Sequence, residues 1–124
     1  MAHELVITTY PAEGRDDVTI MHLRGWWDIK SEESMFQKAN ESHQKGNRKL
    51  VLDLSNMELI TSAGMRSLTK IYNLYTPKTD QDKVTYVRLA NANSDVLHVL
   101  TITAFVNRIP HHETVQGAID AFKA

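Results

Sequence analysis

The sequence predicts an α/β fold in which a mixed, mostly parallel sheet of about five strands packs against about four helices. Two observations support this prediction. Short β-rich or apolar runs alternate with segments whose apolar residues recur at three- and four-residue steps. The first two strand segments follow each other directly, whereas each later strand segment is followed by a helical one. The predicted order is β-β-α-β-α-β-α-β-α, a hairpin followed by right-handed crossovers.

The composition is that of a single soluble domain spanning residues 1–124. The 14 basic and 15 acidic side chains nearly cancel, so no global field attracts nucleic acid or an anionic membrane. The absence of cysteine excludes disulfides and thiolate metal sites and fits a reducing cytosol. No apolar run approaches the roughly 20 residues needed to span a bilayer, and no signal peptide is evident. We therefore expect a cytoplasmic protein without membrane insertion.

The first strands and the first helix are predicted from local composition. Residues 4–10 are β-rich, residues 11–17 form a loop, and residues 18–23 alternate apolar and polar side chains. The motif Gly25-Trp26-Trp27-Asp28 ends the second strand. Ser31 is the predicted N-cap of the first helix, since acidic residues follow it where the helix dipole favours negative charge.

The stretch from Leu50 to Tyr72 is predicted to be a buried strand, a turn and a helix. Its strand is the run 50–54, which is apolar except for Asp53 and is typical of a strand covered on both faces, although its periodicity is equally consistent with a buried helix. Ser55-Asn56 supplies the turn chemistry. The helix runs from Gly64 to about Tyr75, because apolar residues there take helical spacing and Pro77 opposes further continuation. A hydroxyl on Thr61 or Ser62 would cap this helix.

The remaining elements complete the alternation. Residues 83–90 form a strand, Asn93 or Ser94 caps a short helix, and residues 105–109 form a last short strand that ends at Pro110. Residues 111–123 form the final helix, with Glu113 in its first turn and Lys123 in its last, as the helix dipole prefers.

Several short motifs occur in one order along the chain. They are RGWWD (24–28), Asp53-Leu54 at a strand end, Thr61-Ser62-Ala63-Gly64-Met65 at a helix start, and a segment from Val96 to Ile109 that resembles the pattern VxxxLxxTGLxxxF. Together with the element order, these motifs resemble the STAS domains, specifically the single-domain bacterial anti-sigma factor antagonists. The resemblance covers nearly the whole chain and implies a STAS-like fold.

The resemblance implies a partner switch. An antagonist of this family binds an anti-sigma factor that is also a serine kinase of the GHKL type, which frees the sigma factor. The kinase phosphorylates the serine two residues before the glycine, which is Ser62 here, and a PPM-type phosphatase reverses this. Two positions depart from the family pattern: Thr61 replaces an acidic residue, and Ala63 replaces a serine or threonine. Thr61 also supplies a second hydroxyl beside the acceptor.

The residues themselves give an independent argument for Ser62. A hydroxyl at a strand-to-helix joint is exposed to a partner, and Gly64 would let another backbone approach closely. A phosphate of about −1.5 to −2 charge is tolerated at a helix N-terminus, so the fold should survive while binding ends. The alternative is that Ser62 is a plain N-cap contributing about 1 kcal/mol. Taken together with the resemblance, this argument predicts a partner surface that comprises Trp26, Asp28, Thr61, Ser62, Ala63, Gly64, Met65 and Arg66.

Other chemistry has little support in the sequence. His111 and His112 on a helix would point about 100° apart and converge poorly on one metal ion. No Gly-x-Ser-x-Gly motif or glycine-rich phosphate loop is present, so we expect no catalytic residue, no cofactor and no enzyme activity. The alternative function is a scaffold STAS subunit of a larger signalling assembly or of a lipid transporter complex, which phosphorylation does not switch.

Overall fold

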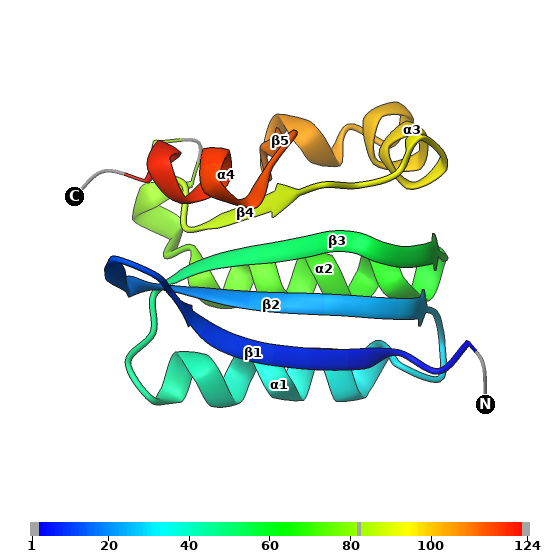
Figure 1. The fold of residues 1–124 in the computed structure, drawn as a ribbon, viewed down its shortest axis with the longest axis horizontal. Helices are drawn as coiled ribbons and strands as arrows, with labels where there is room; N and C mark the ends of the chain where they lie inside the picture. Colours follow the sequence, from blue (N-terminus) through cyan, green and yellow to red (C-terminus); the bar gives the residue numbers. More distant parts are fainter. Residues whose placement is uncertain (1–2, 82, 123–124) are drawn as a thin grey trace.

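The computed structural model describes residues 3–81 and 83–122 and confirms the predicted α/β fold and element order (Figure 1). One sheet has the order β1-β2-β3-β4-β5, in which β1 is antiparallel to β2 and the other neighbours are parallel. The strands are β1 (Val6–Ala12), β2 (Arg15–Trp27), β3 (Lys49–Ile60), β4 (Val87–Ala90) and β5 (His111–His112). The helices are α1 (Glu32–Gln44), α2 (Ser62–Tyr75), α3 (Ser94–Ile102) and α4 (Val115–Ala121), with 3₁₀ turns η1 (Lys78–Asp80) and η2 (Phe105–Asn107).

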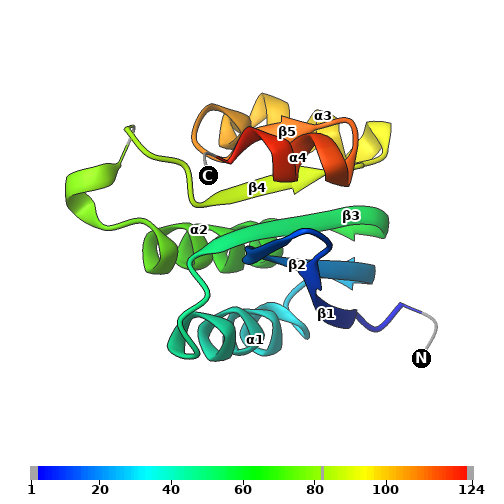
Figure 2. The same cartoon turned by 60° about the vertical axis from the view of Figure 1, so that its left-hand side comes forward.

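Helices cover the two faces of the sheet unequally. Helices α1 and α2 lie next to each other (Figure 2), and their buried residues join Leu50, Leu52 and Leu54 of β3 in the main core. Val51, whose side chain alternates with these leucines, faces the other side and packs in a smaller core with Ile119 of α4. The run 50–54 is therefore apolar because both faces of β3 are covered, as the sequence predicted.

The predicted turn at Ser55-Asn56 is wrong, because β3 continues through it to Ile60. Parallel pairing with β2 persists across this point, because Asn56 lies opposite Arg24 and Ile60 lies opposite Trp27. The register shifts once between His22 and Arg24 and again between Gly25 and Trp26. The Oδ1 atom of Asp53 accepts a hydrogen bond from the Ser55 amide at 3.1 Å. The polar residues thus sit at an irregularity within a long strand, and β2 likewise extends to Trp27, beyond its predicted end at Leu23.

The C-terminal predictions are wrong in detail. Residues 105–109 form no strand; η2 occupies Phe105–Asn107 and follows Ala104, which has a left-handed φ of 65°. The fifth strand is His111–His112, which pairs with β4 where the sequence predicted a helix. Helix α4 starts only at Val115, because Thr114 is its N-cap and accepts from the Gly117 amide at 2.9 Å. Glu113 therefore precedes the helix, and Lys123 lies outside the described residues.

Other boundaries also differ from the prediction. Strand β4 is confined to Val87–Ala90, so residues 83–86 lie outside it. Asn93 is confirmed as the N-cap of α3, because its Oδ1 accepts from the Val96 amide at 2.8 Å. Within residues 3–81 and 83–122, no helix has the length and apolar character needed to cross a membrane.

Candidate functional site

Three chain segments meet at one end of the sheet and form the candidate site. They are the end of β2, the start of α1 and the start of α2. The Thr61 amide donates to the backbone carbonyl of Trp27 at 3.1 Å, which joins the end of β2 to the start of α2. The Ser67 hydroxyl donates to the backbone carbonyl of Glu32 at 2.9 Å, which joins α2 to the first residue of α1. Hydrogen bonds from α2 to both β2 and α1 therefore hold the site in place.

Thr61, and not Ser62, is the N-cap of α2. The Thr61 backbone is extended, and its Oγ1 accepts from the Gly64 amide at 3.5 Å. Ser62 is the first helical residue and is exposed. In the part of the chain that the structure describes, the Ser62 hydroxyl has no hydrogen-bond partner. A plain capping role, the alternative considered for Ser62, thus belongs to its neighbour.

Gly64 serves internal packing and does not open space for a partner. A Cβ atom at this position would lie 2.3 Å from the backbone oxygen of Trp27 and 2.8 Å from Cγ1 of Ile60. Both Ala63 and Gly64 are buried. The expectation that Gly64 lets a partner backbone approach is therefore corrected: the backbone that approaches it is the chain's own β2.

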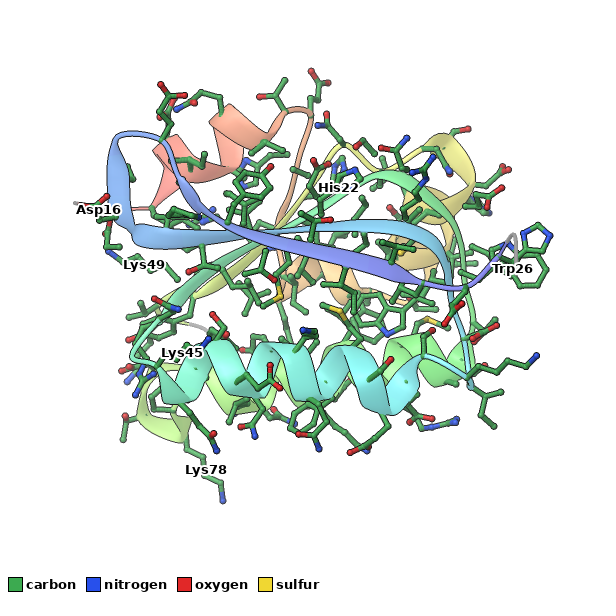
Figure 3. The ribbon with its side chains drawn as sticks, turned by 60° about the horizontal axis from the view of Figure 1, so that its bottom comes forward. Asp16, His22, Trp26, Lys45, Lys49 and Lys78 are labelled. Carbon is green, nitrogen blue, oxygen red and sulfur yellow. The ribbon has the colours of Figure 1, made fainter. Side chains whose placement is uncertain are left out.

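The two tryptophans at the end of β2 have different environments. Trp27 is fully buried in the main core. Trp26 is half-buried and stacks on the His3 ring, with centroids 4.0 Å apart and an interplanar angle of 17°. Figure 3 shows Trp26 at the end of the sheet opposite Asp16 and Lys49. Trp26 lines a groove of about 480 Å³ together with Asp28 and Ser31. Trp26 is therefore accessible from the site end of the molecule.

Asp28 and Ser31 fix the turn between β2 and α1. Ser31 is the N-cap residue by position, as predicted, but its hydroxyl makes no capping bond to α1. Instead, its Oγ accepts from the Asp28 amide at 2.9 Å and donates to the Trp26 carbonyl at 2.9 Å. The Oδ1 of Asp28 accepts from the Lys30 amide at 3.1 Å. These bonds hold the half-buried Asp28 in a defined position beside Trp26.

Arg66 connects α2 to α1 through a paired contact with Glu32. Its Nε and Nη2 atoms donate to the two carboxylate oxygens at 3.1 and 3.2 Å. The Arg66 side chain is 56% exposed and that of Glu32 is 17% exposed. The bond from Arg66 lowers the pKa of Glu32, and the positive charge of Lys70 lowers it further. Met65, beside Arg66, is half-buried and packs against the main core.

The structure brings most of the predicted site residues to one end of the sheet. Sequence reasoning missed two participants, Glu32 and the Trp27 carbonyl. The sequence signal for Glu32 was its place in the first turn of a helix, which indicates a favourable dipole interaction but not its partner. A backbone carbonyl leaves no signal in a sequence. Pairing between α1 and α2 depends on how the crossovers place the two helices.

The histidine pair has a structural role that differs from the predicted helical arrangement. Because His111 and His112 lie on β5, their side chains point to opposite faces. The Nε2 of His111 accepts from the Ala92 amide at 3.0 Å, and the Nε2 of His112 lies 3.1 Å from Nη1 of Arg88. Among residues 3–81 and 83–122, no group of three or more acidic or histidine side chains is arranged to hold a metal ion.

Known proteins share features of this sequence and of this fold. The sequence model of the STAS domain family matches residues 9–118. A search of curated proteins finds no match. Among solved structures, an anti-sigma factor antagonist from Mycobacterium paratuberculosis is similar, with a TM-score of 0.83, 17% identity, and coverage of 100% of this chain and 98% of that one.

Two further solved structures share the fold. An anti-sigma-factor antagonist (STAS) domain protein from Planctomyces limnophilus has a TM-score of 0.69 and 19% identity over 94% of this chain and 95% of that one. The Bacillus cell fate determinant SpoIIAA in its phosphorylated form has a TM-score of 0.65 and 14% identity over 93% of this chain and 97% of that one. At these identities the similarity establishes the fold. Since the family match spans most of the sequence, the chain belongs to the STAS domain family.

Proposed function

We propose that this protein is an anti-sigma factor antagonist whose partner binding is switched by phosphorylation of Ser62. The observation that supports this most is the exposed Ser62 at the first position of α2, while Thr61 takes the capping role. Ser62 is then not needed for the helix start and is available for modification. Several solved structures with this fold are named anti-sigma factor antagonists, and SpoIIAA has been solved in phosphorylated and unphosphorylated forms.

The partner that fits is an anti-sigma factor that is also a serine kinase of the GHKL type. In the modification step, the Ser62 oxygen forms a bond to the γ-phosphorus of ATP. The bond from that phosphorus to the bridging oxygen of ADP breaks, and the hydroxyl proton passes to a base of the kinase or to water. A PPM-type phosphatase would return the serine by hydrolysis, releasing inorganic phosphate. The chain itself acts as substrate and binding partner, not as an enzyme, and needs no cofactor.

The switch follows from charge and burial. Phosphorylation adds about −1.5 to −2 charge at neutral pH, which a partner surface packed on Ser62 would have to desolvate. Within the domain the charge lies at the start of α2, where the helix dipole favours it. Binding is then lost while the fold is retained. The proposed partner surface includes the accessible residues Ser62, Met65, Arg66, Trp26 and Asp28, whereas the buried Ala63 and Gly64 shape its backbone.

In this role, residues 1–124 act as one STAS domain in the cytoplasm without contact to nucleic acid or membrane. The near balance of 14 basic and 15 acidic side chains supports this. The other candidate function is that of a scaffold STAS subunit. The same fold supports this function, and Ser62 has no role in it. A stable multimer or copurified transport subunits would favour that candidate. A monomer that binds one kinase favours the switch.

The test is a pull-down from the native cell with wild type, Ser62→Asp and Ser94→Asp. Ser94 is a matched control, because it is also the exposed first residue of a helix. We expect wild type and Ser94→Asp to capture a GHKL-type kinase and Ser62→Asp to lose it, with all three melting at nearly the same temperature. Equal capture by Ser62→Asp would contradict the proposal.

A further inference from the structure

Arg66 lies one helical turn after Ser62 on α2. Residues four apart on a helix share a face, and their Cβ atoms lie about 5–6 Å apart. Ser62 and Arg66 are both exposed, and Lys70 continues the same row one turn further on. The residue that would carry the phosphate is thus followed on its own helix face by two cations.

The present partner of Arg66 is Glu32, on the neighbouring helix. The contact is bidentate, at 3.1 and 3.2 Å, but the Arg66 side chain remains 56% exposed. The guanidinium end of the pair is therefore open to solvent, whereas the carboxylate end is mostly covered. Lys70 lies close enough to Glu32 to act on the same carboxylate. Glu32 therefore has a second cation available if Arg66 moves.

We propose that a phosphate on Ser62 takes Arg66 from Glu32, so that Arg66 is the residue that positions the phosphate and Glu32 is left to Lys70. This inference rests on the proposed function, since it describes the modified state of the same serine. A phosphate carries more charge than a carboxylate and offers three acceptor oxygens. The planar guanidinium group can bind a phosphate through two parallel hydrogen bonds, as it binds the Glu32 carboxylate. The Arg66–phosphate pair therefore keeps the bidentate geometry of the Arg66–Glu32 pair.

The helix junction would withstand this exchange. The backbone carbonyl of Glu32 stays bonded to the Ser67 hydroxyl at 2.9 Å, which does not involve the carboxylate. The first turn of α1 therefore stays in place while its carboxylate loses Arg66. Modification of one serine then changes the surface at two points. A phosphate appears on α2, and the Glu32 carboxylate on α1 is no longer neutralised by the Arg66 guanidinium. A partner that contacts both helices meets both changes.

The experiment uses the full chain with phosphoserine incorporated at position 62 during translation, so that no kinase is required. The pH dependence of the ³¹P resonance gives the pKa of the phosphate, and carboxyl ¹³C resonances give that of Glu32. Three chains carrying phosphoserine at position 62 are compared. They are wild type, Arg66→Gln, and Lys70→Gln, which removes the next cation of the same row. Phosphoserine at position 94 is the positional control, because it starts α3 and is followed four residues later by His98.

We expect the pKa of phosphoserine 62 to be lower by roughly half a unit or more when Arg66 is present than in Arg66→Gln, because a nearby cation favours the dianion. Lys70→Gln should change it less, and phosphoserine 94 should not respond to Arg66→Gln. The pKa of Glu32 should rise on phosphorylation by more in wild type than in Arg66→Gln. An unchanged phosphate pKa in Arg66→Gln, or an equal rise for Glu32, would overturn the exchange. If instead no cellular kinase modifies Ser62, the proposed function fails while this measurement stands.

Discussion

The backbone carbonyl of Trp27 lies 3.1 Å from the amide nitrogen of Thr61 and accepts its hydrogen bond. A Cβ atom on residue 64 would lie only 2.3 Å from the same oxygen. One carbonyl therefore fixes the start of α2 against the end of β2 and requires glycine at position 64. The exposed Ser62 lies between Thr61 and Gly64, so contacts within the domain fix the backbone that carries it.

Gly64→Ala should destabilise the protein by about 1–3 kcal/mol, because the added methyl group overlaps backbone that cannot easily move. The Cβ atom would lie 2.3 Å from the Trp27 oxygen. Urea denaturation measures the loss. Gly117→Ala is the matched control in α4, where the nearest atom is the Thr114 hydroxyl at 3.1 Å. Equal losses at the two positions would show that the contact with Trp27 is not the cause.

The capping arrangement predicts that removal of the Thr61 hydroxyl and removal of the neighbouring Ser62 hydroxyl affect stability differently. Thr61→Ala removes the side chain that accepts from the Gly64 amide and should cost roughly 0.5–1 kcal/mol of stability. Ser62→Ala removes a hydroxyl that is exposed and has no partner within residues 3–81 and 83–122, so it should be nearly neutral. Thermal and urea denaturation compare the two variants. A larger loss for Ser62→Ala would return the capping role to Ser62.

Ala104→Gly should stabilise the protein. Ala104 has a φ of 65°, a left-handed conformation that costs a residue with a side chain about 1–2 kcal/mol. Glycine removes this cost but gains entropy in the unfolded state, so a net gain of about 0.5–1 kcal/mol is expected. Asn91→Gly is the control, because asparagine tolerates its φ of 60° better than alanine does. A loss of stability in Ala104→Gly would contradict this reading of the backbone.

Acid should destabilise the fold through the histidines of β5. Burial lowers the pKa of His111 and of His112, and each uses Nε2 as an acceptor. The folded-state values lie below the unfolded value of about 6.5, so their contribution is complete above that pH and is lost as the pH falls below it. Urea denaturation from pH 7.5 to 5.5 should show this decline, and the double variant His111→Gln/His112→Gln should flatten it.

The exposed His98 on α3 supplies the control for this pH dependence. His98→Gln should retain the decline of the wild type. A double variant that keeps the full decline would assign the acid sensitivity to other groups, with the partly buried His43 as the next to test, since burial also lowers its pKa.

Helical spacing and apolar runs were enough to predict the fold class and the element order. Burial of one face of an element leaves a period in the sequence, and burial of both faces leaves a continuous apolar run. Helix α2 begins at Ser62, two residues before the predicted Gly64, and of the two hydroxyls offered as its cap the structure selects Thr61. The end of β3 was missed because Ser55 and Asn56 have turn chemistry, yet pairing with β2 continues past them. The short β5 was missed for the same reason: two histidines have no strand pattern, and only their pairing with β4 makes them a strand.

The candidate site was predictable where a residue type carries the signal. Ser62, Arg66 and Trp26 could be proposed from motif and position. The role of Gly64 could not, since a glycine beside a helix start is equally consistent with a partner outside and a backbone inside. The Arg66–Glu32 contact joins residues that are far apart in sequence, and its existence depends on the packing of α1 against α2.

The most direct test of the central claim is phosphate incorporation by the captured kinase. Wild type, Ser62→Ala and Thr61→Val would each be mixed with that kinase and ATP, and the modified residue mapped by mass spectrometry. The account predicts one phosphate on Ser62 in the wild type and in Thr61→Val, and none in Ser62→Ala. Phosphate on Thr61, or undiminished incorporation in Ser62→Ala, would contradict it.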